Sequence, residues 1–187
     1  MSAEVRDTDA AHAPVLARLK CMANNDLPLV FWDKAREPGE TALDAGIRLL
    51  ADPAERADMR VCLRDGQVVG LAQSFLSPEP PAPSLPELAP LGRLKARIVG
   101  HLYLDTIAVL PAARRTGAAT ALLRDCLARA GAVGAPAVSL LVLGQNHGAR
   151  ATYERFGFAE AARAALQPEH WPIPPQDIVL MTRPLDP

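Results

Sequence analysis

The chain has 187 residues, of which 49% are hydrophobic and 22% charged, and its formal net charge is −1. This composition is typical of a globular protein and excludes a disordered chain and a fibrous repeat, while the length favours one domain covering residues 1–187. The nearly balanced charge argues against a protein that binds nucleic acid through an overall basic field.

The sequence contains no evident targeting segment, disulfide framework or metal-binding pattern. The N-terminus lacks a cationic start followed by an apolar core, and no apolar run approaches the ~18 residues of a membrane span. Cys21, Cys62 and Cys126 are far apart without a CxxC motif, and the histidines lack metal-ligand spacing. We therefore expect a cytoplasmic protein with reduced thiols and no metal, and with neither a membrane nor a nucleic acid as partner.

The first half of the chain predicts helices followed by an antiparallel hairpin. Asp9 is a suitable N-cap for the first helix, and Asp65-Gly66 between two apolar runs is a strong hairpin turn signal. The elements expected here are a strand at 3–6, a helix at 10–22, a loop or broken helix at 24–40, a helix at 41–50 and strands at 60–63 and 67–76.

A proline-rich connector follows the hairpin. Six prolines lie between residues 78 and 90, and proline lacks the N–H that a strand ladder or a helix needs. We expect an extended connector over residues 77–98 that forms a surface excursion within the single domain.

Helices alternate with strands in the second half of the chain, which favours a parallel arrangement. The expected elements are strands at 101–109, 137–143, 157–165 and 178–183 and helices at 116–131 and 149–156. The predicted fold class is therefore α/β: a mixed sheet, antiparallel in its N-terminal half and parallel in its C-terminal half, flanked by helices.

The loop after the strand at 101–109 has the composition of an anion site. Arg114 and Arg115 precede Gly117, and an Ala- and Leu-rich helix starts directly after this glycine. The first N–H groups of a helix lack internal partners, arginine offers forked donors for phosphate, and small residues let oxygens approach the backbone. A bound diphosphate is one interpretation, and a solvated turn with two surface arginines is the other. The Walker and dinucleotide-binding motifs are both absent.

Two motifs in register resemble those of one enzyme family. Arg114-x-x-Gly117-x-Ala119 resembles the acetyl-CoA signature, Gln/Arg-x-x-Gly-x-Gly/Ala, of the GNAT N-acetyltransferase superfamily. The segment from Asn146 to Phe158 looks like that family's second motif, Asn-x-x-Ala-x-x-x-Tyr-x-x-x-Gly-Phe. The gap between the motifs fits one helix and one strand, and the predicted element order matches the family fold, in which two parallel strands splay apart.

The resemblance implies acetyl-CoA as a co-substrate. In this family the strand before the loop pairs with the pantetheine arm, the loop amides hold the pyrophosphate, and the segment after the next strand often contacts the cofactor. The cofactor-binding residues implied here are Ile107, Ala108, Val109, Arg114, Arg115, Thr116, Gly117, Ala118, Ala119, Thr120 and Asn146.

Tyr153 is the general acid that the resemblance implies. A phenol of pKa ~10 can protonate a departing thiolate of pKa ~8.5 if it lies close by. Ala149, Tyr153 and Phe156 also share one helical face, so a packed core tyrosine is the alternative interpretation.

Asp105 is the candidate general base. An alkylammonium of pKa ~10.4 must lose a proton before it attacks, and a carboxylate can accept that proton, often through water. Alternation along the strand places His101, Tyr103 and Asp105 on one face, near the position where some family members carry an acidic base. A polar residue at a strand irregularity is the alternative, and an exposed amine could need no dedicated base.

The resemblance places the acceptor side at residues 24–38 and the proline-rich connector. Phe31 and Trp32, together with Asp26 and Asp33, would form an aromatic wall with carboxylates, which suits a cationic amine. An amphipathic helix that packs Trp32 into the core is the alternative. The acceptor amine, a small molecule or a protein, is not identified by the sequence. Family members often dimerise, so a homodimer is a further expectation.

The predicted function is an N-acetyltransferase that moves the acetyl group of acetyl-CoA to a primary amine by direct nucleophilic attack. Two alternatives are a non-catalytic acyl-CoA-binding or sensing module of the same fold, and a phosphate- or nucleotide-binding interaction domain that uses residues 114–119. Neither alternative explains the segment from Asn146 to Phe158.

Overall fold

The computed structural model describes residues 3–185, which divide into two compact units. The N-terminal unit consists of the chain up to Ser74, Thr106–Cys126 and His170–Pro172. The C-terminal unit consists of Phe75–Asp105, Leu127–Glu169 and the chain from Ile173 onward. Each unit is therefore assembled from segments that are far apart in the sequence.

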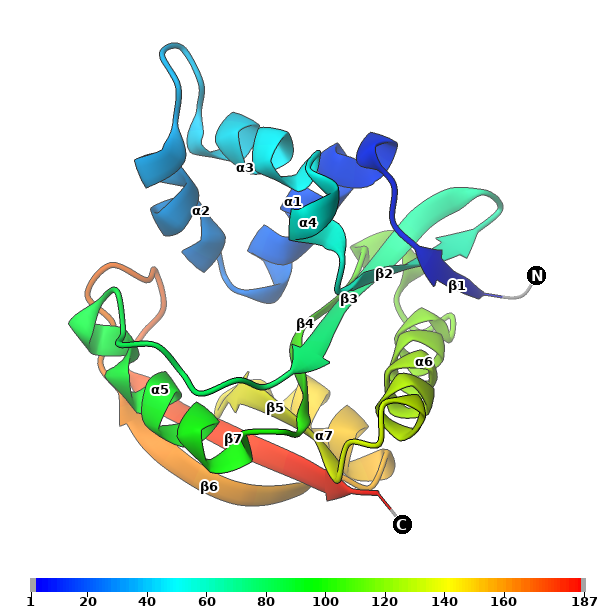
Figure 1. Ribbon diagram of the computed structural model, residues 1–187, viewed down its shortest axis with the longest axis vertical. Coiled ribbons are helices and arrows are strands. Elements are labelled where there is room, and N and C mark those ends of the chain that lie inside the picture. The colour runs from blue at the N-terminus through cyan, green and yellow to red at the C-terminus, as the bar shows by residue number, and fades with distance from the viewer. Residues whose placement is uncertain (1–2, 186–187) are drawn as a thin grey trace. The chain divides into compact units, whose positions relative to one another are not determined.

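Seven strands form one mixed sheet. They are β1 (Glu4–Asp7), β2 (Met59–Arg64), β3 (Gln67–Leu76), β4 (Leu102–Val109), β5 (Ala137–Leu143), β6 (Ala159–Leu166) and β7 (Gln176–Pro184). Their hydrogen-bonded order is β1-β2-β3-β4-β5-β7-β6 (Figure 1). The β4–β5 pair is parallel, whereas β1–β2, β2–β3, β5–β7 and β7–β6 are antiparallel. The predicted α/β class with a mixed sheet is confirmed.

Helices flank the sheet. They are α1 (Ala13–Ala23), α2 (Leu27–Trp32), α3 (Ala42–Leu50), α4 (Pro53–Arg56), α5 (Ala89–Lys95), α6 (Ala118–Ala132) and α7 (His147–Arg155). None of the helices within residues 3–185 combines the length and the apolar character that crossing a membrane requires.

In the N-terminal unit, β2 and β3 form the hairpin predicted from Asp65-Gly66. The φ angles of these two residues are 52° and 76°, and a type I′ hairpin turn requires positive values at both positions. Helices α1, α2 and α3 pack on one another (Figure 1). Together with the hairpin they enclose an apolar core that includes Leu16, Leu19, Leu50, Met59, Val61 and Leu71.

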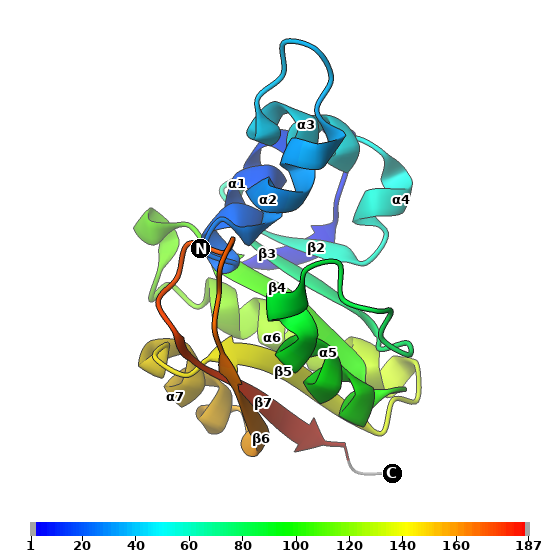
Figure 2. The ribbon, with the colours of Figure 1, turned by 90° about the vertical axis from the view of Figure 1, so that its left-hand side faces the viewer.

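In the C-terminal unit, β5 pairs with the first half of β4 and with β7. Helix α5 packs on the antiparallel β6–β7 pair (Figure 2). The buried cluster beneath α5 contains Leu94, Ile98, Tyr103, Ile178 and Leu180. Leu94 of α5 and Tyr103 of β4 therefore belong to the same buried cluster.

Contrary to the expectation from the sequence, the proline-rich connector is not extended throughout. Residues 89–95 form α5, flanked by 3-10 turns at Pro86–Leu88 and Ala96–Ile98. Pro86 and Pro90 each lie in the first turn of their helix, where a backbone N–H has no intrahelical partner to lose. The number of prolines suggested a break, but their positions permit a helix.

The C-terminal half of the sheet is less parallel than expected, because β7 runs antiparallel to both β5 and β6. Parallel neighbours need a crossover connection, and residues 167–175 join β6 to β7 without a helix.

Two smaller differences concern the helices. The first predicted helix begins as a 3-10 turn, Ala10–His12, and α4 was not expected although Asp52 caps it.

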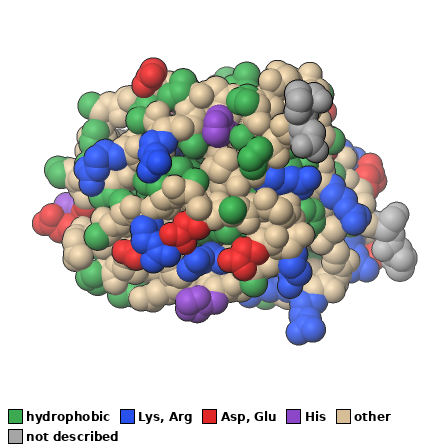
Figure 3. Space-filling model, turned by 90° about the horizontal axis from the view of Figure 1, so that it is seen from below, with side chains coloured by type: hydrophobic (Ala, Val, Ile, Leu, Met, Phe, Trp, Pro, Cys, Tyr) green, Lys and Arg blue, Asp and Glu red, His purple; other side chains and the backbone are tan. Residues whose placement is uncertain are grey.

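The mixing of charges on the surface and the free state of the cysteines agree with what the sequence predicts. Basic and acidic side chains adjoin one another on the face drawn in Figure 3, as the balanced net charge predicts. Cys21, Cys62 and Cys126 are buried free thiols. Burial raises the pKa of Cys21 to about 11 and also raises the pKa of Cys62, so neither is an activated thiolate.

Candidate functional site

The loop between β4 and α6 lies entirely within the N-terminal unit. After a 3-10 turn at Pro111–Ala113, Arg114 is extended, and Arg115 and Gly117 have positive φ angles of 63° and 90°. The N–H of Ala121 donates to the carbonyl of Gly117, so the hydrogen bonds of α6 start at this glycine. Left-handed residues just before a helix turn successive N–H groups toward the same side, a geometry that forms anion-binding concavities.

The start of α6 is therefore suited to a phosphate group. The amides of Ala118, Ala119 and Thr120 have no partner four residues earlier within the helix, and the helix dipole places partial positive charge there. A Cβ on Gly117 would meet no atom within 4 Å, so the backbone at this glycine is open to a ligand. Arg114 and Arg115 are exposed beside it. These residues fit a diphosphate.

Strand β4 is held closely where it approaches this loop. The N–H of Leu110 donates to the carbonyl of Val69 at 2.8 Å. A Cβ on Gly70 would lie 3.0 Å from the carbonyl oxygen of Ala108 and 3.1 Å from a methyl of Leu122. Gly70 was not predicted as a site residue, although a glycine inside a strand pattern often marks such a close backbone approach.

The loop between α1 and α2 is fixed by hydrogen bonds from distant residues of the N-terminal unit. The indole N–H of Trp171 donates to the carbonyls of Asn24 and Asn25 at 2.8 and 3.1 Å. The Asn24 side chain donates to the Thr106 hydroxyl on β4 at 3.3 Å. Asn25 and Asp26 have φ angles of 47° and 62°. Trp171 was missed by sequence reasoning, and a lone tryptophan in a proline-rich segment was the available signal.

A pocket of about 270 Å³ opens beside this loop. Met22, one of its lining residues, lies 3.9 Å from the guanidinium of Arg114, measured from sulfur to nitrogen. The pocket therefore borders the arginine that precedes the anion site. Its lining residues are Arg18, Cys21, Met22, Asp26, Leu29 and Leu43.

The two aromatic residues predicted for the acceptor side differ in exposure. Trp32 is only 9% exposed and belongs to the apolar core, whereas Phe31 is half-buried. An added Cβ on Gly46 would lie 2.3 Å from the Trp32 ring, so helix α3 packs directly on the indole. The packing of Trp32 agrees with the alternative that was stated for it, and Phe31 has the more accessible ring.

Replacing Gly46 with alanine is expected to lower the free energy of unfolding by about 1–3 kcal/mol, because the new methyl would overlap the Trp32 ring. Urea denaturation measures this loss. The matched control is Gly92→Ala in α5, where an added Cβ meets nothing within 4 Å and a gain of about 0.5–1 kcal/mol is expected. Equal effects of the two substitutions would contradict the tight packing.

Tyr153 lies in α7 and Asn146 is the N-cap of that helix, in the C-terminal unit. The side-chain carbonyl of Asn146 accepts from the N–H of Ala149 at 3.2 Å and caps the helix. Tyr153 is 8% exposed, and its ring packs edge-on against Phe158 with centroids 5.9 Å apart. Burial raises the pKa of Tyr153 to about 12. The phenol therefore stays protonated at neutral pH, as a proton donor must.

Asp105 belongs to a small cluster in the same unit. Its carboxylate lies 3.7 Å from the ammonium of Lys95, and both side chains are partly exposed. Tyr103 is buried, and the pKa of its phenol is raised well above its usual value, first by burial and then by the nearby Asp105 and Tyr153. The structure thus places the proposed base and the proposed acid both near enough to Tyr103 to affect its pKa.

Comparison with known proteins identifies a family and a fold. The acetyltransferase (GNAT) family matches residues 25–158. The structure resembles an N-acetyltransferase from Staphylococcus aureus Mu50, with a TM-score of 0.64 and 16% identity over 100% of each chain. It also resembles a ribosomal-protein-alanine N-acetyltransferase from Brucella melitensis, with a TM-score of 0.64 and 19% identity over 97% of this chain and 99% of that one.

A third similar structure is Naa20 from Chaetomium thermophilum in complex with a bisubstrate analogue. Its TM-score is 0.62, with 22% identity over 97% of this chain and 86% of that one. No curated protein matches the sequence. At these identities the structural neighbours establish the fold, and the family match covers both sequence motifs.

Proposed function

Because the chain belongs to the acetyltransferase (GNAT) family and is therefore an acyltransferase, we propose that it transfers the acetyl group of acetyl-CoA to a primary amine by direct nucleophilic attack. The observation that carries the proposal is the open anion-binding loop at the start of α6, with Gly117 at a φ of 90°.

The loop would bind the diphosphate of acetyl-CoA through the backbone N–H groups of residues 115–120, with the exposed Arg114 adding positive charge. The backbone of Ile107, Ala108 and Val109, at the end of β4, would pair with the pantetheine arm. Asn146 already caps α7 through its side-chain oxygen, so a contact between this residue and the cofactor would have to coexist with the cap.

Proton transfers would be divided between two residues of the C-terminal unit. Asp105 would accept a proton from the acceptor's ammonium, directly or through water, before the nitrogen attacks the thioester carbonyl. Tyr153 would donate its phenolic proton to the sulfur as the carbon–sulfur bond breaks. Its pKa of about 12 makes the phenol a weak acid but keeps it fully protonated, and the thiolate that it must protonate has a pKa of ~8.5.

The test is release of free thiol from acetyl-CoA in the presence of a panel of primary amines, together with mass spectrometry of the amine. We expect amine-dependent thiol release and a gain of one acetyl group on the acceptor. Tight binding of acetyl-CoA without thiol release from any amine would instead favour a non-catalytic acyl-CoA-binding module.

A further inference from the structure

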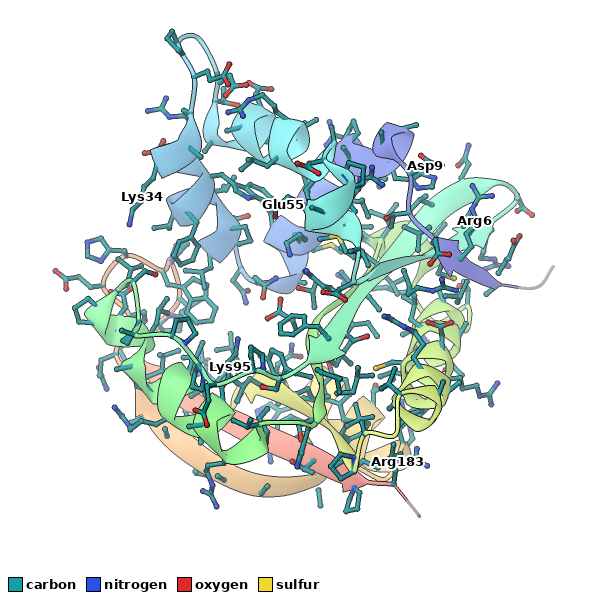
Figure 4. All side chains as sticks on the ribbon, in the orientation of Figure 1. Arg6, Asp9, Lys34, Glu55, Lys95 and Arg183 are labelled. Atoms are coloured by element: carbon teal, nitrogen blue, oxygen red, sulfur yellow. The ribbon has the colours of Figure 1, made fainter. Side chains whose placement is uncertain are left out.

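Lys95 is the last residue of α5 and lies in the C-terminal unit (Figure 4). The Nζ atom lies 4.5 Å from the centroid of the Tyr103 ring, over its face. The same atom lies 3.7 Å from Oδ1 of Asp105. One side chain of the protein thus occupies a position between an aromatic face and a carboxylate.

This combination is a recognition site for an alkylammonium ion. The negative face of an aromatic ring attracts a cation within about 6 Å of its centroid, and a neighbouring carboxylate adds a full opposite charge. The ring of Tyr103 is buried and is held by an edge contact with Phe75, whose centroid is 5.7 Å away. The site therefore persists if the lysine side chain leaves.

Lys95 is able to leave, since its side chain remains 30% exposed. Surface ion pairs contribute little net stability because water competes for both charges, and the long lysine side chain pays conformational entropy to stay in place. A second alkylammonium of the same chemistry can therefore exchange with it.

We propose that Tyr103 and Asp105 form the ammonium subsite for the acceptor, that Lys95 fills this subsite at rest, and that the acceptor is a primary alkylammonium on an unbranched methylene chain. This inference rests on the proposed acetyl transfer. An ammonium that displaces Nζ would lie beside the carboxylate proposed as the base and over the ring of Tyr103. Tyr153, the proposed acid, is near enough to Tyr103 to raise the pKa of its phenol.

Every bond and proton is accounted for when the acetyl group is transferred to an ammonium bound at this subsite. The acceptor nitrogen gives one proton to Asp105 and forms a bond to the acetyl carbon, while the carbon–sulfur bond of the thioester breaks. The departing sulfur takes the phenolic proton of Tyr153, and the second proton of the acetylated nitrogen passes to the resulting phenolate through water. The products are the neutral N-acetylated amine, free CoA and one proton held by Asp105.

The direct test is refilling of the subsite in Lys95→Ala, which removes three methylenes and the ammonium. We expect n-propylammonium chloride to raise the Tm of this variant in a saturable manner and to act on the wild type only at about tenfold higher concentration. n-Propanol, which has the same chain without the charge, should have no effect. Arg93→Ala, which removes an exposed cation from the same helix, is the matched control and should behave as the wild type.

Two results would overturn the subsite. One is the absence of any n-propylammonium effect on Lys95→Ala. The other is an equal effect on Lys95→Ala and on the double variant Lys95→Ala/Asp105→Asn, because the carboxylate would then play no part. Lys95→Ser, which also vacates the subsite, provides a second variant if Lys95→Ala does not fold.

A kinetic measurement connects the subsite to the acceptor. For an alkylamine that supports thiol release, Lys95→Ala should lower KM for the amine by about tenfold, which corresponds to removing roughly 1.4 kcal/mol of internal competition. An unchanged KM would mean that the acceptor binds elsewhere. The Kd for acetyl-CoA is measured separately. If n-propylammonium refills Lys95→Ala but acetyl-CoA does not bind, the proposed acetyl transfer fails while the ammonium site stands.

Discussion

Replacing Gly117 with glutamate is expected to raise the Kd for acetyl-CoA by about 100-fold or more, a loss of roughly 2.7 kcal/mol of binding free energy. The physical reason is local. The glutamate side chain would enter the open space above the loop, and its negative charge would meet the diphosphate at the positive end of α6. Isothermal titration calorimetry with acetyl-CoA measures the change.

Two controls separate charge from backbone strain, because Gly117 has a positive φ that any other residue would adopt at a cost. Gly117→Ala introduces the strain without the charge and should weaken binding far less. Gly134→Glu introduces both at another glycine with positive φ and open space, just after α6, and should leave the Kd unchanged. An unaltered Kd in Gly117→Glu would refute the assignment of the loop.

Tyr153→Phe is expected to lower kcat by about 100-fold while the Kd for acetyl-CoA stays constant, because a general acid typically contributes 10²–10⁴-fold. Phenylalanine keeps the ring and its edge contact with Phe158 and removes only the hydroxyl. Tyr153→Leu is the companion variant, since it also removes the ring contact and should lower the Tm. A kcat at the wild-type level in Tyr153→Phe would leave Tyr153 with a packing role alone.

The pKa of Tyr153 also sets a pH profile. Because burial raises this pKa to about 12, the acid is fully protonated from neutral pH to above pH 10 and is lost only as the pH approaches 12. The acceptor amine, with a pKa of ~10.4, becomes neutral over the same range. Because the proposed subsite binds the ammonium form, we expect kcat/KM to stay level from pH 7 to about pH 9 and to fall only as the acceptor loses its charge. A fall below pH 9 would indicate a different acid.

Structural features that depend on residues adjacent in the sequence could be predicted from the sequence. Asp65 and Gly66 specified a hairpin turn through their tolerance of positive φ. The helix expected at 116–131 is α6, Ala118–Ala132, because Gly117 precedes a segment rich in Ala, Leu and Arg. The spacing of Arg114, Gly117 and Asn146 led to the family, which the match over residues 25–158 confirms.

Features that depend on contacts between distant segments could not be predicted in the same way. Trp171 binds the carbonyls of Asn24 and Asn25 across nearly 150 positions of sequence, and no local pattern encodes that pairing. The position of Lys95 over Tyr103 depends on α5, which the prolines of the connector concealed. The burial of Trp32 likewise follows from Gly46, a residue on another helix.

The roles of individual site residues stay predictions, because those roles also depend on contacts between distant segments of the chain. Asp105, Tyr103 and Tyr153 are neighbours in the C-terminal unit, which supports a shared role in proton transfer. The roles of Ile107, Ala108, Val109 and the loop amides rest on the conformation of the N-terminal unit and on the family motif. The variants described above test the two groups of residues independently.

The most direct test of the account is a thermal-shift titration of the whole chain with acetyl-CoA, CoA and ATP as separate ligands. A ligand that binds only the folded protein raises its apparent stability. We predict a saturable rise in Tm with acetyl-CoA and with CoA and none with ATP, because the loop lacks the lysine of a Walker motif. No shift with either form of CoA, or an equal shift with ATP, would contradict the claim that this chain uses acetyl-CoA.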